Sequence, residues 1–467
     1  MDATIEAYGM DATISPVGRM NASVLHWLRC PFCGGQLNPS GIEPVPQASG
    51  YDVLTCWCGR YPVVAGIPIL KRGPDGTIDK VIALIESGRQ REALLAAIAP
   101  ASPTLAPSWI RSLPSARGLH RLKHLAHQRA LRGWRERAAA LLTDHRGRVT
   151  VCALLDFYFH NHRENYNYFY FRFGQPRYLV ALSFASIIHQ PKKPILDLAC
   201  GCGHITRTLV QRAQGQPVIG LDNSFFGLYI AKHWIAPEAE YVCSPADGPL
   251  PFPNGAFSTV FCSDALHYFV NKATSIRELE RLTRQDGLII LVWIHNTLVR
   301  RPHDGLPLPP EGYRALVADV PHRLVADGDV LARYRQKLGP QLAGSADARR
   351  LAQAPLLSLV ASRRQEVFQD YGTFANWPHA EGHLSLNPLY MVEEQEKLGI
   401  VHLRRKFPSA FYEEEHTECK DYLPETVRVS SGVWTNVAEG KHTAEMAGLV
   451  EQCVLLGLPT RYRCDAC

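Results

Sequence analysis

The chain has 467 residues, of which 46% are hydrophobic, and a net charge of +6. These values predict a globular protein of about two domains with additional irregular segments. No apolar run reaches the roughly 18 residues of a membrane helix, and the first residues lack the pattern of a secretory signal. We therefore expect a soluble, cytoplasmic protein without membrane partners. Thirteen cysteines, four of them in close pairs, favour a reducing compartment and metal binding over a disulfide framework.

Two cysteine pairs predict a small metal-binding domain over residues 25–72, after an N-terminal tail of residues 1–24. Cys30 and Cys33 are separated by two residues and followed by two glycines, and only one residue separates Cys56 from Cys58. Closely spaced thiolates can reach one ion, and glycines let the chain turn beneath it. The four cysteines are therefore candidate ligands of a structural Zn²⁺. A metal-free packed remnant is the alternative.

Residues 73–150 are predicted to form a basic, helical connector. The segment 111–148 holds ten Lys and Arg residues against Glu136 and Asp144. The cations lie around a helix that also carries several leucines, so a solvated helical face is the usual interpretation. Contact with RNA phosphates is the alternative.

Residues 151–467 begin with an aromatic stretch and then alternate between strands and helices. We expect strands at 195–199, 217–222, 257–263 and 288–294, with helices between them. This alternation predicts an α/β fold with a doubly wound, mainly parallel sheet. Residues 296–382 are predicted to be a mostly helical insertion, and 384–405 and 422–437 to supply the last strands.

A glycine-rich turn follows the first of these strands. Residues 197–203 read Asp-Leu-Ala-Cys-Gly-Cys-Gly, and Asp222 ends the next strand some 20 residues later. The glycines let backbone approach a ligand closely, and an acid at that distance can bind ribose hydroxyls. A dinucleotide fingerprint has a third glycine where this chain has Thr206. The turn therefore predicts a nucleoside ligand.

Residues 195–203, 220–222 and 246–268 resemble successive motifs of class I S-adenosylmethionine-dependent methyltransferases, in the ubiquinone-biosynthesis-like branch. The resemblance implies a Rossmann-like, seven-stranded methyltransferase sheet with S-adenosylmethionine as cofactor. It also implies that the methionine end lies at Asp197 and the glycine turn, the ribose at Asp222, and the adenine at Asp247 and Gly248. The full set of candidate cofactor-binding residues is Asp197, Ala199, Gly201, Gly203, Asp222, Asn223, Asp247, Gly248 and Ser263.

His267 is the candidate catalytic base, because the superfamily often places a residue facing the methyl group just after the fourth strand. A histidine with a pKa near neutrality suits proton removal from an acceptor. A packed or capping histidine is the alternative interpretation. Segment 413–416, Glu-Glu-Glu-His, is interpreted as a solvated turn.

Residues 28–70 resemble zinc-ribbon activator subunits of tRNA methyltransferases, although that family separates its second cysteine pair by two residues. Cys464 and Cys467 are considered for a second metal site with Cys419 and Cys453. A ribbon beside a methyltransferase also resembles ribosomal RNA guanine methyltransferases. We favour a small-molecule acceptor that offers oxygen, carbon or a ring nitrogen, in secondary or cofactor metabolism. The alternatives are a ribosomal RNA or tRNA base methyltransferase, and an inactive methyltransferase-like module that binds a protein.

Overall fold

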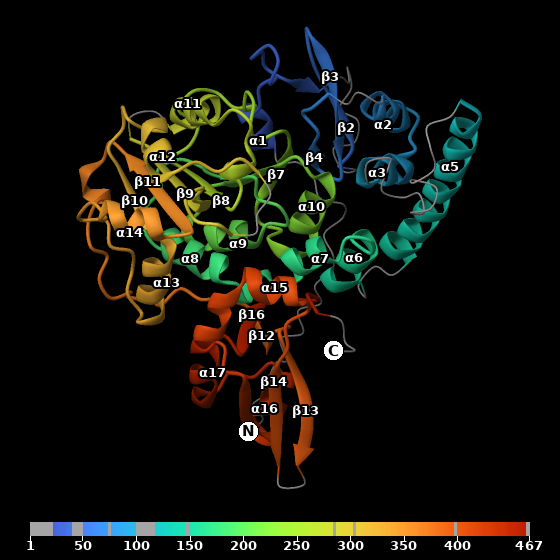
Figure 1. Cartoon of the computed structure of the whole chain (residues 1–467). Helices are drawn as coiled ribbons and strands as arrows, with labels where there is room; N and C mark the ends of the chain where they lie inside the picture. Colours follow the sequence, from blue (N-terminus) through green and yellow to red (C-terminus); the bar gives the residue numbers. More distant parts are fainter. Residues whose placement is uncertain are drawn as a thin grey trace, which may run out of the picture.

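A seven-stranded mixed sheet forms the centre of the molecule (Figure 1). The computed structural model describes residues 22–39, 50–72, 76–99, 117–144, 149–283, 286–301, 305–396 and 399–463. The parallel strands are β5 (Ile195–Leu198), β6 (Val218–Asp222), β7 (Glu240–Cys243), β8 (Thr259–Ser263) and β9 (Leu288–His295). Two antiparallel strands, β10 (His322–Ala326) and β11 (Leu356–Ser362), complete the order β10-β11-β9-β8-β5-β6-β7.

The strand order opens a ligand-binding crevice at the centre of the sheet. The chain runs outward from β5 through β6 to β7 and then crosses to β8 on the other side of β5. Loops after β5 and β8 therefore leave in opposite directions, and open α/β sheets bind ligands at such a switch point. The predicted α/β fold with a parallel core is confirmed.

Helices cover both faces of this sheet and divide its side chains between two cores. α8 (Pro176–Ala185) and α9 (His204–Arg212) share one core with Ile195. α11 (Lys272–Thr283) and α12 (Pro310–Leu316) share the other with Leu196. Because neighbouring strand residues point into opposite cores, β5 and β9 are buried along their whole length. This double burial explains their uninterrupted apolar sequences.

The predicted positions of the last sheet strands were wrong. β10 and β11 both lie inside residues 296–382, which the sequence indicated as a helical insertion. That segment does contain helices, α12, α13 (Asp327–Arg335) and α14 (Ala348–Gln353), and their Ala- and Arg-rich composition obscured the strands between them. A short apolar run such as 356–362 fits a buried strand and a buried helix equally well.

Residues 384–405 and 422–437 instead contribute to two small antiparallel sheets beside the central one. β12 (His383–Leu386) pairs with β16 (Leu455–Leu458). β13 (Tyr390–Glu396), β14 (Ile400–Arg405) and β15 (Thr426–Ser430) form the other sheet, and α16 (Ser431–Ala438) follows it. In Figure 1 these elements project below the central sheet. We call them the C-terminal lobe.

The N-terminal module is a four-stranded antiparallel sheet that joins the edge of the central sheet. It comprises α1 (Ala22–Trp27), β1 (Asn38–Pro39), β2 (Asp52–Cys56), β3 (Gly59–Val64) and β4 (Ile67–Pro68). Just after β4, Ile69 pairs with Cys243 of β7 in parallel, and the Leu70 amide donates to the Cys243 carbonyl at 2.7 Å. The module thus continues the central sheet beyond β7.

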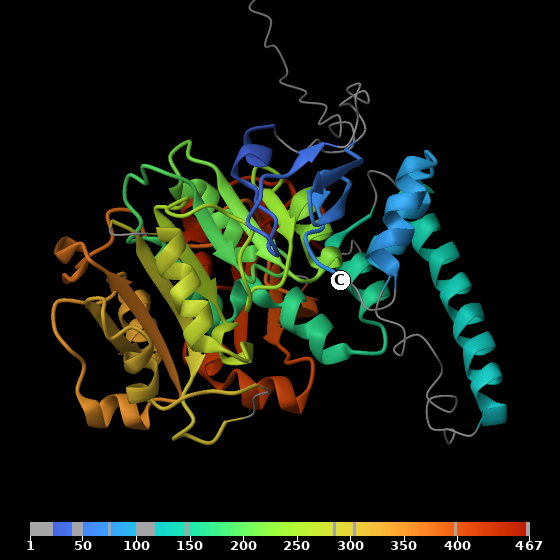
Figure 2. The same ribbon diagram turned by 90° about the horizontal axis from the view of Figure 1, so that it is seen from above.

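Helices α2 (Thr77–Glu86), α3 (Gln90–Ile98) and α5 (Arg117–Ala139) connect the module to the aromatic segment. The basic helix α5 stands at the outer side of the molecule in both views (Figures 1 and 2). Its Trp134 packs against Phe157, with ring centroids 5.5 Å apart, in α6 (Val151–Tyr158). Among the described helices, none is long and apolar enough to span a bilayer.

Candidate functional site: a cavity at the carboxyl edge of the sheet

The turn between β5 and α9 has the strained backbone of a ligand-binding loop. Ala199, Gly201 and Gly203 all have positive φ, at 57°, 56° and 79°. A left-handed conformation is costly for alanine, and such residues are concentrated at functional sites. A Cβ on Gly203 would lie 2.7 Å from the Cβ of Ala231. A glycine is therefore required at position 203 so that the start of α9 can pack closely against Ala231.

The glycine turn forms the floor of a cavity of about 320 Å³ with a smaller inner extension of about 30 Å³. Seven of the nine predicted cofactor residues line the two spaces: Asp197, Ala199, Gly201, Asp222, Asn223, Asp247 and Ser263. Gly203 and Gly248 do not line them. The structure therefore brings most of the predicted set to one place.

Two carboxylates, the buried one of Asp197 and the partly buried one of Asp222, hold this floor in shape. Asp222 accepts hydrogen bonds from the Gly201 amide at 2.9 Å and the Ser224 amide at 2.7 Å, one on each oxygen. Asp197 accepts a 2.6 Å hydrogen bond from the hydroxyl of Thr206. Burial raises the pKa of both acids, that of Asp197 to about 7. Thr206, which stands where a dinucleotide site has glycine, is thus a hydrogen-bond partner of Asp197.

The aromatic segment closes the cavity from above. Tyr168 and Phe169, in α7 (Arg163–Tyr170), line both spaces. A Cβ on Gly201 would lie 3.1 Å from the Phe169 ring. Tyr268 and Phe269 add a second aromatic wall. The aromatic residues before the glycine turn therefore belong partly to the site and not only to the core.

A buried ionic cluster, which the sequence analysis missed, lies against the inner end of the cavity. Asp264 Oδ2 accepts hydrogen bonds from Arg177 at 2.5 Å, Arg172 at 3.1 Å and Tyr168 at 3.0 Å. Burial alone would raise the pKa of Asp264, but the two guanidinium groups hold it well below its usual range. Asp264 also has a φ of 59°. The sequence held two signals of this cluster: an acid directly after Ser263, and arginines within the aromatic segment.

Helix α15 (Ala410–Glu415), which lies between β14 and β15 in the chain, contacts this cluster through Arg177. The guanidinium also donates to Glu415 at 2.7 Å and to Nε2 of His416 at 2.6 Å. The predicted solvated turn at 413–416 is therefore wrong for His416, which is 1% exposed and stacks on Tyr412. Burial and the neighbouring Arg177 lower the pKa of His416 well below its usual value. It is therefore a neutral hydrogen-bond acceptor.

His267 is buried beside the site but does not line the cavity. Its ring lies 4.3 Å from that of His295, centroid to centroid. Asp264, His267 and His295 offer ligand atoms within 4.8 Å of one another. Two arginines already neutralise Asp264, and they oppose a further cation at this position. We therefore do not assign a metal to these three residues.

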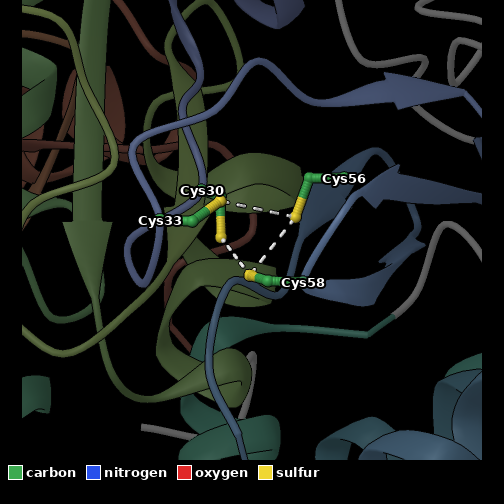
Figure 3. A group of neighbouring side chains, drawn as sticks. All are labelled: Cys30, Cys33, Cys56 and Cys58. Atoms are coloured by element: carbon green, nitrogen blue, oxygen red, sulfur yellow. Dashed lines mark hydrogen bonds between the residues drawn. The ribbon is translucent and has the colours of Figure 1, made fainter.

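The four cysteines of the N-terminal module converge at the end of a β-hairpin (Figure 3). Their sulfurs lie 3.5 Å apart for Cys30 and Cys58, 3.8 Å for Cys33 and Cys56, and 3.6 Å for Cys56 and Cys58. The single residue between the second pair occupies the hairpin turn, where Trp57 is 86% exposed. The unusual spacing therefore does not separate the thiols. Cys464 and Cys467 lie outside the described residues.

The module also contacts the cofactor-side loop of the cavity. The Lys71 ammonium donates to the Asn223 carbonyl at 2.6 Å and to its side-chain oxygen at 3.0 Å. Asn223 follows Asp222 directly and lines the cavity. The position of this loop therefore depends on how the module docks on β7.

Residues 196–291 match the family model described as a methyltransferase domain. The chain carries an S-adenosylmethionine-dependent methyltransferase domain. It is 31% identical over 132 residues to a demethylmenaquinone methyltransferase of Thermus thermophilus, which covers 28% of this chain and 54% of that protein. It is 30% identical over 97 residues to a malonyl-[acyl-carrier protein] O-methyltransferase of Legionella pneumophila, and this match covers 21% of this chain and 34% of that protein.

Among solved structures, the YcgJ protein of Bacillus subtilis aligns with 39% of this chain and 98% of its own, at 18% identity and a TM-score of 0.29. This chain spans about half of the first curated relative and about a third of the second. The matched family model covers residues 196–291, which include neither the N-terminal module nor the C-terminal lobe.

Proposed function

We propose that this chain transfers a methyl group from S-adenosylmethionine to a small molecule that offers oxygen, carbon or a ring nitrogen. The observation that carries the proposal is the shape of the cavity. Asp222 and Asp247 stand at its nucleoside side, Asp197 at its inner end, and aromatic rings close it. Methyl transfer is an in-line displacement that loses the sulfonium charge, so the protein has mainly to align the reactants and exclude water.

In this proposal Asp222 holds the ribose, Asn223 and Asp247 face the adenine, and Asp197 with Ser263 faces the methionine end. Arg172 lines the same inner space and is the cation that suits the methionine carboxylate. Tyr168 and Phe169 on α7 cover the cofactor and form one wall for the acceptor. His267 remains a candidate base that would have to act from behind Asp264 and Tyr268.

The relatives, by name, act on demethylmenaquinone and on malonyl-[acyl-carrier protein], which supports an acceptor other than nucleic acid. The basic helix α5 contributes no residue to the cavity lining within the described part of the chain. Calorimetry with S-adenosylmethionine, followed by a product-mass screen of small molecules, tests the proposal. Absence of cofactor binding would favour an inactive, protein-binding module. Binding of RNA that steepens as salt falls, with methyl transfer to it, would favour the RNA alternative.

The pH dependence of cofactor binding should report Asp197. Its pKa of about 7 means that the free protein takes up a proton there as the pH falls, and a protonated acid cannot pair with the methionine ammonium. Affinity should therefore weaken about tenfold between about pH 8 and pH 6. Isothermal titration calorimetry of the chain and of Asp197→Asn measures this. The ionisation of the ligand itself affects both proteins equally. If the affinity changes with pH equally steeply in both proteins, Asp197 is not the group that controls binding.

We also propose that Cys30, Cys33, Cys56 and Cys58 hold a structural Zn²⁺. With Zn–S bonds of about 2.3 Å, the edge of a tetrahedron is about 3.8 Å, and the sulfur separations of 3.5–3.8 Å fit it. Burial raises the pKa of Cys30, but hydrogen bonds from Tyr61 and nearby amides outweigh it and lower this pKa to about 6. The bound metal would keep the hairpin folded and thereby keep Lys71 at the cavity.

Metal analysis of the purified chain should give one zinc per molecule. Cys33→Ser together with Cys56→Ser should abolish the zinc content and lower the thermal midpoint, because structural zinc supplies folding free energy. Removing the ion with a chelator should reproduce the loss, and adding Zn²⁺ should restore the wild-type midpoint only in the unmutated chain. An unmutated chain that binds no zinc and keeps its midpoint in chelator would show a metal-free ribbon.

A further inference from the structure

A second cavity, of about 740 Å³, lies between α7 and the C-terminal lobe. Its walls come from α7, from β12 and β13, and from α16. This volume falls within the range of small-molecule sites, which is about 300–1,000 Å³. The residues that line this cavity all lie outside the range 196–291 that the methyltransferase family model covers.

The two faces of α7 line the two cavities. Tyr168 and Phe169 face the cofactor side, whereas Tyr166, Asn167 and Tyr170 line the second cavity. The second cavity is therefore separate from the proposed cofactor site but shares one eight-residue helix with it. A ligand that orders α7 from one side acts directly on the wall of the other site.

The lining is apolar over most of its surface. Tyr170 and Trp434 provide aromatic faces and Leu384 an aliphatic one. Met391 and Val392, both lining residues, are 42% and 39% exposed. Large apolar side chains left open beside a cavity indicate a ligand that covers them.

The polar groups of the cavity favour an anion. Arg163 and Arg463 line it, whereas no carboxylate of the described residues does. Arg163 also pairs with Asp156, but that pair is about half exposed, and exposed pairs are weak enough to rearrange around a ligand. Asn167 is 7% exposed and lines the cavity. Its side-chain amide can donate a hydrogen bond to an anionic group in the cavity.

We propose that this cavity binds an elongated apolar molecule that carries one anionic group, a carboxylate or a phosphate. The chain of the ligand lies against Tyr170, Trp434 and Leu384, and its anionic group lies between Arg163 and Arg463 within reach of Asn167. This binding site goes beyond the proposed methyl transfer and does not require the ligand to be methylated.

Calorimetry on the full chain with decanoate, decyl phosphate and decanol tests the proposal. Both anions should bind, and the better one at least about tenfold more tightly than decanol, since a hydrogen bond to a charged group contributes about 1.5–3 kcal/mol. The two anions distinguish a fatty-acid-like ligand from a phosphate ester. No saturable binding of either anion, or equal affinity for decanol, would overturn the proposal.

Two variants on α16 locate the binding. Ala438→Trp fills the cavity and should reduce anion affinity at least about tenfold. Thr435→Trp is the matched control, since Thr435 is exposed on the same helix and does not line the cavity, and its affinity should be unchanged. Equal binding by both variants would place the ligand elsewhere. Titration with S-adenosylmethionine checks that each variant is folded, and it tests the proposed cofactor site independently of the second one.

Discussion

Asp264→Ala should destabilise the protein by about 3–5 kcal/mol, because it leaves the buried Arg172 guanidinium without its carboxylate and removes one of the two carboxylates that pair with Arg177. The side chains of Arg172, Arg177 and Asp264 are 7%, 4% and 4% exposed. Water therefore cannot replace the lost partner. The effect should appear as a lower midpoint of urea unfolding, followed by tryptophan fluorescence.

The matched control is Asp329→Ala, which removes an acid paired with Arg350. That pair is about half exposed, and exposed pairs contribute about 0–1 kcal/mol. If the two variants unfold at similar urea concentrations, the Asp264 cluster does not contribute to stability as argued. A smaller loss in Asp264→Asn than in Asp264→Ala is also expected, since the amide oxygen still accepts a hydrogen bond.

Asp222→Ala should weaken S-adenosylmethionine binding about 100-fold. The variant loses both the proposed ribose contact and the hydrogen bond that holds Gly201, and a hydrogen bond to a charged group contributes about 1.5–3 kcal/mol. Calorimetry measures the affinity directly, and circular dichroism checks that the sheet remains folded.

Asp156→Ala serves as the control, because Asp156 is an acid about half exposed, paired with Arg163, that does not line the cofactor cavity. Its cofactor affinity should match that of the unmutated chain. An Asp222→Ala protein that still binds the cofactor with wild-type affinity would remove Asp222 from the proposed ribose site.

The sequence predicts the parallel strands β5, β6, β8 and β9 because each of them is signalled locally, but it misses the short parallel strand β7. The strand that ends at Asp222 and the turn at 197–203 carry apolar, glycine and acidic residues at fixed distances, and the structure brings them to one cavity. The antiparallel strands β10 and β11 have no such marker. β11 pairs with β9 through residues far apart in sequence, and β10 pairs only with β11.

The ionic cluster could not be predicted from the sequence for a similar reason. Arg177, Asp264 and His416 lie in three distant segments, and none is part of a local pattern. The sequence favoured a solvated turn at His416 because neighbouring glutamates are usually exposed. The buried Arg177, which needs acceptors on more than one side, reverses that expectation.

The hydrogen bond from Leu70 to Cys243 has a consequence during synthesis. The ribosome makes the N-terminal module first, but its partner strand β7 emerges only about 170 residues later. At about 5–20 residues per second, the nascent module waits roughly 10–30 s before it can dock. During that interval α2 and α3 can already cover one face of the small sheet. The face of Leu54 and Tyr61, which packs into the core that Val242 of β7 shares, stays open, and the proposed Zn²⁺ on the four thiols would hold the sheet together until β7 arrives.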